Sequence, residues 1–134
     1  MKMIQYNRTQ IVLREARGYK QVCAESISHI VCEDYICTIY LLSEKEVNSS
    51  KSLSYFEELL TPLFFFRINR NALINLKQID KVVCRGRQRK VVMKEGVSVH
   101  IAIRRWPAFR KAFQEGSLTS DYGSFAVENG AFTG

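Results

Sequence analysis

The chain has 134 residues, a hydrophobic content of 46% and only two prolines. This composition is typical of one folded domain and excludes a disordered chain. No apolar run approaches the roughly 20 residues that cross a bilayer, and no secretory signal opens the sequence, so we expect a cytoplasmic protein without a membrane segment. The net charge of +7 is concentrated in residues 67–113, which hold 13 basic and two acidic residues, and this surplus favours a polyanion such as nucleic acid as partner.

Strand patterns dominate the first third of the chain. Residues 10–14 and 21–24 flank a glycine-containing connection and predict a hairpin. Residues 27–31 and 35–42 are rich in β-branched and aromatic side chains, which suit a half-buried sheet. The acidic residues 33–34 between these two runs predict a second hairpin with a tight turn.

The middle of the chain predicts a polar loop at residues 43–50, followed by a helix. Residues 52–60 follow a period near 3.6, and Pro62 ends the pattern. Ser54 and Glu57 have the spacing of a capping box, which would satisfy the first free amides of this helix. The expected inner face consists of Leu53, Phe56, Leu59 and Leu60.

An aromatic segment comes next, and its extended backbone separates two faces. We assign Phe64, Phe66 and Ile68 to the core, while Phe65, Arg67 and Asn69 share the other face. This alternation predicts that polar groups are delivered beside the core.

The last third predicts three strands and a short helix. Residues 79–84 and 90–93 are joined by a basic, glycine-containing connection, and residues 97–103 alternate cleanly. The expected core face of this last strand is Val97, Val99, Ile101 and Ile103. The helix that follows carries Trp106, Phe109 and Phe113 on one side.

Together these elements predict a mainly β fold of about eight short strands with two short helices. We divide the chain into an N-terminal extension at residues 1–9, a folded domain at residues 10–114 and a flexible C-terminal tail at residues 115–134.

The sequence offers no motif for catalysis or for metal binding. It has two histidines, no nucleophile motif and no glycine-rich phosphate loop, so we expect no enzyme, no catalytic residue and no cofactor. His29, Cys32 and Cys37 lack the paired spacing of a zinc site. The four cysteines, Cys23, Cys32, Cys37 and Cys84, are expected to be small buried hydrophobes.

Residues 65–79 read Phe-Phe-Arg-Ile-Asn-Arg-Asn-Ala-Leu-Ile-Asn-Leu-Lys-Gln-Ile. This segment resembles the signature F-x-R-V/I-H-R-S-x-I/L-V/I-N-L/I-x-x-I of the LytTR DNA-binding domain family. Residues 27–35 and 97–105 resemble the flanking family segments. Asn69 and Asn71 stand where the family usually has His and Ser, and Ala102 stands where it has a further Ser.

The resemblance implies an elongated domain of eight to ten strands in three small sheets, which binds promoter DNA through loops. Such domains read two successive major grooves and approach the minor groove between them. Carried onto this chain, the base or groove contacts are Tyr35, Asn69, Arg70, Arg104 and Arg105, and the backbone contacts are Arg67, Asn71 and Lys77.

The side-chain chemistry agrees with these positions. Arg104 is the first choice for a base contact, because a guanidinium fork engages guanine O6 and N7 together and gives roughly 1 to 3 kcal/mol of discrimination. An alignment shifted by one residue makes Arg105 the reader. Three roles stay open for Asn69 and Asn71: a base contact with adenine, a phosphate contact, or stabilisation of the turn in which they lie. Asn75 is expected to be structural, its amide holding the loop that presents Arg70.

The leading hypothesis is a transcriptional regulator that binds double-stranded DNA sequence-specifically, as a homodimer on repeated promoter sites. Two alternatives remain: a non-catalytic interaction module that holds a partner regulator or sensor protein, and a small RNA-binding β protein. A sheet that reads RNA displays exposed aromatic side chains on a strand face, which separates this alternative from DNA binding.

Overall fold

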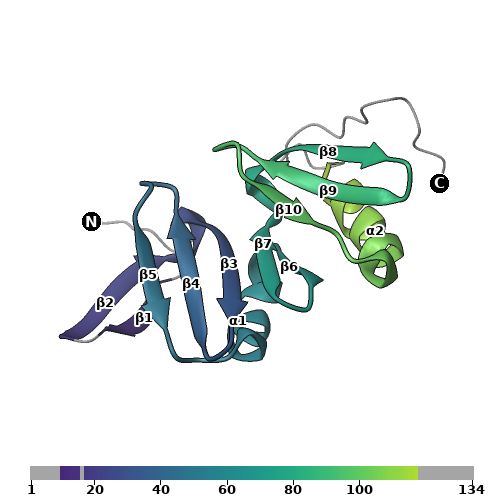
Figure 1. Cartoon of the computed structure of the whole chain (residues 1–134). Coiled ribbons are helices and arrows are strands. Elements are labelled where there is room, and N and C mark those ends of the chain that lie inside the picture. Colours follow the sequence, from purple (N-terminus) through teal and green to yellow (C-terminus); the bar gives the residue numbers. More distant parts are fainter. Residues whose placement is uncertain (1–9, 16, 118–134) are drawn as a thin grey trace, which may run out of the picture.

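The computed structural model describes residues 10–15 and 17–117, which form ten strands in three antiparallel sheets and two α-helices (Figure 1). The predicted mainly β fold with two helices is therefore confirmed. The expected extension at residues 1–9 and most of the expected tail lie outside the described residues. The last helix continues to Ser117, past the expected end of the domain at residue 114.

Two sheets make up the N-terminal part. A two-stranded sheet joins β1 (Gln10–Glu15) to β2 (Gly18–Cys23). A five-stranded sheet has the order β5-β4-β3-β7-β6. Its strands are β3 (Ile27–Glu33), β4 (Ile36–Leu41), β5 (Glu46–Ser49), β6 (Phe65–Asn69) and β7 (Ala72–Asn75). The helix α1 (Leu53–Leu60) connects β5 to β6 and packs beside the sheet (Figure 1).

The C-terminal part is a three-stranded sheet with the order β10-β9-β8, covered by one helix. Its strands are β8 (Ile79–Arg85), β9 (Gln88–Met93) and β10 (Ser98–His100), and the helix is α2 (Trp106–Ser117). Phe109 and Phe113 of α2 are fully buried, as predicted. Four short 3-10 turns connect elements, at Ala24–Ser26, Thr61–Leu63, Leu76–Gln78 and Ile103–Arg105.

Buried side chains form two clusters that share the strand pair β6–β7. The N-terminal core gathers residues of β1 to β5 and α1, together with Phe65 and Leu73 of the shared pair. The C-terminal core gathers residues of β8 to β10 and α2 around Phe109, together with Ile68 and Ile74 of the pair. The strand pair β6–β7 is therefore covered on both of its faces.

This double burial explains an error in the sequence analysis. Phe64, expected in the core, is 46% exposed and adopts a left-handed φ of 72°, whereas Phe65 is buried. Phe65 faces the N-terminal core, whereas Phe66 and Ile68 both pack in the C-terminal core, as their alternation predicts. Alternation separates a core face from a solvent face only where one side of the strand is open to water.

Two further strand predictions need correction. Residues 43–50 were expected to be a loop, but Glu46–Ser49 forms β5, which pairs with β4 and buries Val47. The last strand is shorter than predicted: β10 ends at His100, and Ile103 is 72% exposed. The chain turns away from the sheet at Ala102, whose N–H donates to Ile68 O at 3.1 Å.

The predicted helix cap is also placed wrongly. Ser52 is the N-cap, and its Oγ accepts the Tyr55 N–H at 3.1 Å. Ser54 and Glu57, the expected capping box, instead bind the Arg67 side chain. Leu59, expected on the inner face, is 38% exposed, while Leu53, Phe56 and Leu60 are buried as predicted.

A partly buried polar cluster links the two parts of the molecule. Ser28 Oγ of β3 donates to Glu95 Oε1, in the turn between β9 and β10, at 2.8 Å. Because this hydroxyl has a single proton, the contact of 2.9 Å between Ser28 Oγ and His29 Nδ1 requires the ring N–H to donate. His29 is 3% exposed and stacks on Tyr40 with ring centroids 4.6 Å apart.

Burial lowers the pKa of His29 below its usual 6.5, although the nearby Glu95 carboxylate acts in the opposite direction. The unfolded chain then binds a proton more readily than the folded protein. The stability that His29 contributes is complete above pH 6.5 and is lost as the pH falls below that value.

We therefore expect the melting temperature to decrease between pH 7.5 and pH 5.5, as followed by circular dichroism. The decrease should be smaller in His29→Gln, which cannot take up the proton. His100→Gln is the matched control, because His100 is exposed on β10. An equal decrease in wild type and His29→Gln would show that other groups cause it.

Candidate nucleic-acid interface

Three loops of the molecule meet along two adjoining grooves. The arginine groove, of about 670 Å³, is lined by Glu57, Arg67, Asn69, Arg70, Asn71, His100, Ala102, Arg104 and Arg105. The hairpin groove, of about 320 Å³, extends from the β3–β4 turn to the start of α1 and includes Tyr35. Arg67, Arg70 and Asn71 line both grooves, so the β6–β7 turn lies between them.

The Asn69 side chain is hydrogen-bonded within the protein. Its Nδ2 donates to His100 O at 2.8 Å, which ties β6 to β10, and its Oδ1 accepts the Asn71 N–H at 2.8 Å. The second bond is the local turn chemistry typical of asparagine. Asn69 therefore shapes the β6–β7 turn.

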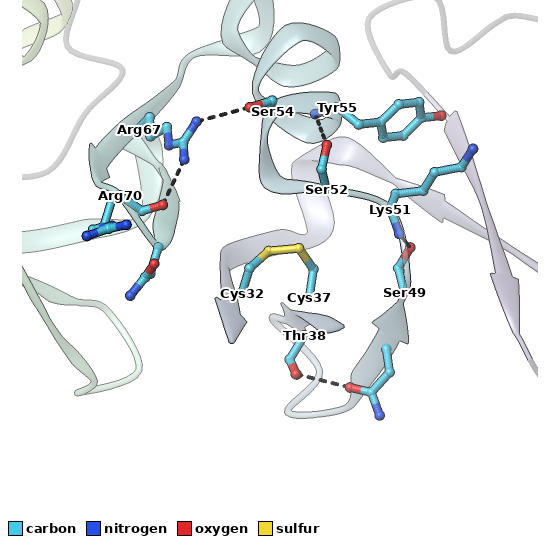
Figure 2. Close-up of a disulfide and its surroundings, with 12 residues drawn as sticks. Cys32, Cys37, Thr38, Ser49, Lys51, Ser52, Ser54, Tyr55, Arg67 and Arg70 are labelled. Carbon is cyan, nitrogen blue, oxygen red and sulfur yellow. Dashed lines mark hydrogen bonds between the residues drawn. A yellow bond between two sulfur atoms is a disulfide. The ribbon is translucent and has the colours of Figure 1, made fainter. Parts of the chain in front are cut away.

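Arg67 also bonds within the protein, and Figure 2 shows its guanidinium pointing toward α1. Nη1 lies 3.0 Å from Glu57 Oε1 and 3.3 Å from Ser54 Oγ, and Nη2 donates to Arg70 O at 2.7 Å. The ion pair is partly exposed, so it contributes about 1 kcal/mol at most. Its main effect is positional, because it holds the carbonyl of the β6–β7 turn against α1.

Arg105 anchors the segment that precedes α2. Its Nε donates to Arg67 O at 3.0 Å, and its guanidinium lies 4.7 Å from the centre of the Phe66 ring. The Arg105 N–H donates to Ala102 O at 2.9 Å and closes the turn. These contacts fix the backbone on either side of Arg104.

Arg70 and Arg104 differ from these two arginines. Both are exposed, and neither guanidinium has a hydrogen bond or an ion pair with any residue in the described part of the chain. Figure 2 shows the Arg70 side chain extending away from Arg67. The groove between Arg70 and Arg104 has Glu57 as its one acidic lining residue, and Arg67 already pairs with it.

Tyr35 and Asn71 lie on the hairpin groove. Tyr35 is 89% exposed at the tip of the β3–β4 turn, next to Asp34, which has a left-handed φ of 55°. Asn71 is exposed, and its carbonyl accepts the Cys32 N–H at 2.8 Å. The β3–β4 hairpin is therefore bonded to the β6–β7 turn through its backbone.

Lys77 and Asn75 lie apart from the two grooves, at the other end of β7. Lys77 Nζ is 4.5 Å from the centre of the Phe64 ring. Asn75 is 3% exposed, its Nδ2 donates to Ile27 O at 2.9 Å, and its Oδ1 accepts the Lys77 N–H at 3.0 Å. Asn75 thus holds the loop that follows β7, whereas we expected it to hold the loop that presents Arg70.

Of the four cysteines expected to be small buried hydrophobes, only Cys84 fits the prediction, because Cys23 is half-buried and the other two are bonded to each other. Cys32 and Cys37 are paired directly across β3 and β4 and form a disulfide (Figure 2). Cys23 and Cys84 take no part in this disulfide, and burial raises the pKa of Cys84. In the described part of the chain, no three His, Cys, Asp or Glu side chains come together as a metal site. The placement of Cys32 and Cys37 on either side of a tight turn was a signal for the disulfide.

A comparison with known families identifies the family of the chain. The family model of the LytTr DNA-binding domain matches residues 17–114. The chain belongs to the LytTR DNA-binding domain family. The segment that resembles the family signature, residues 65–79, forms β6 and β7 and includes the turn that bears Arg70 and Asn71.

A solved structure has the same fold as this LytTR domain. It is the LytTr DNA-binding domain assigned to a methyl-accepting/DNA response regulator from Bacillus cereus, with a TM-score of 0.69 and 21% sequence identity. The match covers 78% of this chain and 95% of that chain. No curated protein matches the sequence. Within the described residues, no helix is long and apolar enough to span a membrane.

Proposed function

We propose that this LytTR domain is a transcriptional regulator that binds double-stranded DNA sequence-specifically, with Arg104, Arg70 and Tyr35 entering the grooves. The observation that carries the proposal is the pair of exposed guanidinium groups, Arg70 and Arg104, which line one groove and have no bonded partner among residues 10–15 and 17–117. An arginine that is not bonded within the protein retains the planar fork that recognises guanine in the major groove.

The order of the side chains supports contacts in successive grooves. Tyr35 lines only the hairpin groove, Arg104 lines only the arginine groove, and Arg70 lines both grooves. A duplex laid along the two grooves would meet the β3–β4 turn, the β6–β7 turn and the segment before α2 in that sequence. Neighbouring major grooves on one face of DNA lie one helical turn apart, about 10 base pairs.

Rigid support of the contact residues favours sequence-specific binding. Arg67, Asn69 and Arg105 are bonded within the protein on either side of Arg70 and Arg104. Side chains projected from a fixed backbone lose less entropy on binding than side chains on a free loop. We therefore assign positioning roles to Arg67, Asn69 and Arg105, and phosphate contact to the free amide of Asn71.

Selection of bound sequences from random duplex DNA tests the proposal. We expect enrichment of a motif with two conserved blocks about one helical turn apart, and an affinity for that motif that falls steeply with salt. A pool of structured RNA at the same salt concentration is the control. Failure to enrich any DNA motif, or equal retention of RNA, would overturn the proposal.

A further inference from the structure

The Cys32–Cys37 disulfide lies at the junction of the two loops that line the hairpin groove. Both cysteines line this groove together with Tyr35, Arg70 and Asn71. The disulfide closes the β3–β4 hairpin just before its two-residue turn, so it constrains the turn that carries Tyr35. Figure 2 shows the disulfide facing the region between the β6–β7 turn and the start of α1.

The backbone of Cys32 carries this constraint to the second loop. Its N–H donates to Asn71 O at 2.8 Å, although β3 and β7 pair through the ladder only between His29 and Val31 on the β3 side. The Cys32 residue thus carries both the sulfur atom and the N–H that binds the β6–β7 turn. The hairpin that holds the disulfide is therefore bonded through its backbone to the turn that carries Asn71 and Arg70.

The two cysteines differ in exposure. Cys32 is half-buried, whereas Cys37 is 2% exposed in the N-terminal core. An external thiolate can therefore approach Cys32 more easily than Cys37, and exchange depends on which sulfur is accessible. Disulfides in reducing compartments are usually redox-sensing or catalytic.

We propose that Cys32–Cys37 is a site of thiol–disulfide exchange with small thiols of the glutathione class, and that the disulfide form binds DNA more tightly. The proposal rests on the proposed function. A thiolate attacks the Cys32 sulfur, the Cys32–Cys37 bond breaks, and Cys37 leaves as a thiolate that takes up a proton. A second thiolate attacks the external sulfur of the mixed disulfide and releases Cys32, so two external thiols become one external disulfide.

The disulfide form binds more tightly because its hairpin is already ordered. Reduction removes the covalent closure and leaves the turn to the sheet hydrogen bonds alone. The duplex must then order the Tyr35 turn on binding, at a cost that corresponds to an affinity about 3- to 10-fold lower.

The experiment uses the full chain carrying Cys23→Ser and Cys84→Ala, so that Cys32 and Cys37 are its remaining thiols. Affinity for the enriched duplex, and for a random duplex of equal length, is measured in reduced and in oxidised glutathione. Mass spectrometry after alkylation reports the state of the pair. We expect the oxidised form to bind the enriched duplex about 3- to 10-fold more tightly.

The added double substitution Cys32→Ser and Cys37→Ser is the control, and it should bind like the reduced form in both buffers. Circular dichroism checks that it is folded, and the reduced parent gives the same comparison if it is not. Equal affinity in the two verified states, or a pair that stays reduced in oxidised glutathione, overturns the proposal. Absence of any preference for the enriched duplex in either state instead overturns the proposed function.

Discussion

Replacement of Arg104 by alanine is expected to remove most of the preference for the selected DNA sequence over random DNA. Arg104 is exposed on the arginine groove and has no partner in the described part of the chain, so its loss leaves the fold intact. A bidentate contact to guanine is worth roughly 1 to 3 kcal/mol, which corresponds to about 5- to 150-fold in the specificity ratio. Gel-shift titrations with both duplexes at one salt concentration measure this ratio.

Arg87→Ala is the matched control, because Arg87 is an exposed arginine in the β8–β9 turn and lines neither groove. Its loss removes one positive charge from the same part of the chain. We expect a small and equal weakening for both duplexes, since a charge acting at a distance does not discriminate bases. Equal losses of specificity for Arg104→Ala and Arg87→Ala would contradict the assignment of Arg104 as a reader.

Replacement of Asn75 by alanine is expected to give the largest loss of stability among the polar residues discussed. The side chain is buried, and its removal leaves Ile27 O and the Lys77 N–H without their partner. An unsatisfied buried group costs about 1 to 3 kcal/mol, and the bond to the Lys77 N–H is only part-buried, so the two together reduce the free energy of unfolding by about 2 to 4 kcal/mol. Urea or thermal unfolding followed by circular dichroism measures this change.

Asn71→Ala provides the comparison, since Asn71 is exposed and its side chain has no hydrogen bond within the described ranges. We expect its unfolding midpoint to stay close to that of the wild type, while DNA affinity decreases. The folded fraction of Asn75→Ala should keep its preference for the selected sequence. An unchanged midpoint for Asn75→Ala would contradict the structural role.

Much of the fold was visible in the sequence because its signals are local. The β3–β4 hairpin is marked by two β-rich runs on either side of an acidic turn, and α2 is marked by the spacing of Phe109 and Phe113. The signature at residues 65–79 is continuous, so the resemblance identifies the turn that carries Arg70 from the sequence alone.

The internal bonds of the candidate site could not be predicted in this way. Arg67 and Asn69 have the same residue types as DNA contacts, and their partners lie elsewhere in the chain: Glu57 precedes Arg67 by ten positions, and His100 follows Asn69 by 31. Sequence patterns give the donors and acceptors, whereas tertiary packing decides which of them are already bonded. The exposure that distinguishes Arg70 and Arg104 from the bonded arginines of the site, Arg67 and Arg105, is known only from the fold.

The disulfide depends on strand register. Cys32 and Cys37 are directly opposite in the ladder, so both side chains lie on one face of the sheet. A slip of one residue would place them on different faces, and the sequence alone does not determine that register. The sequence also placed Phe65 opposite the core face, and that prediction was wrong because both sides of β6–β7 are covered.

The covering of β6–β7 on both sides also has a consequence for how the protein unfolds. Opening of the C-terminal sheet and α2 would expose Ile68 and Ile74 to water, and opening of the N-terminal sheet would do the same to Phe65 and Leu73. Neither half keeps a complete hydrophobic interior when the other melts. The domain is therefore expected to denature in a single cooperative transition, without a half-folded intermediate at equilibrium.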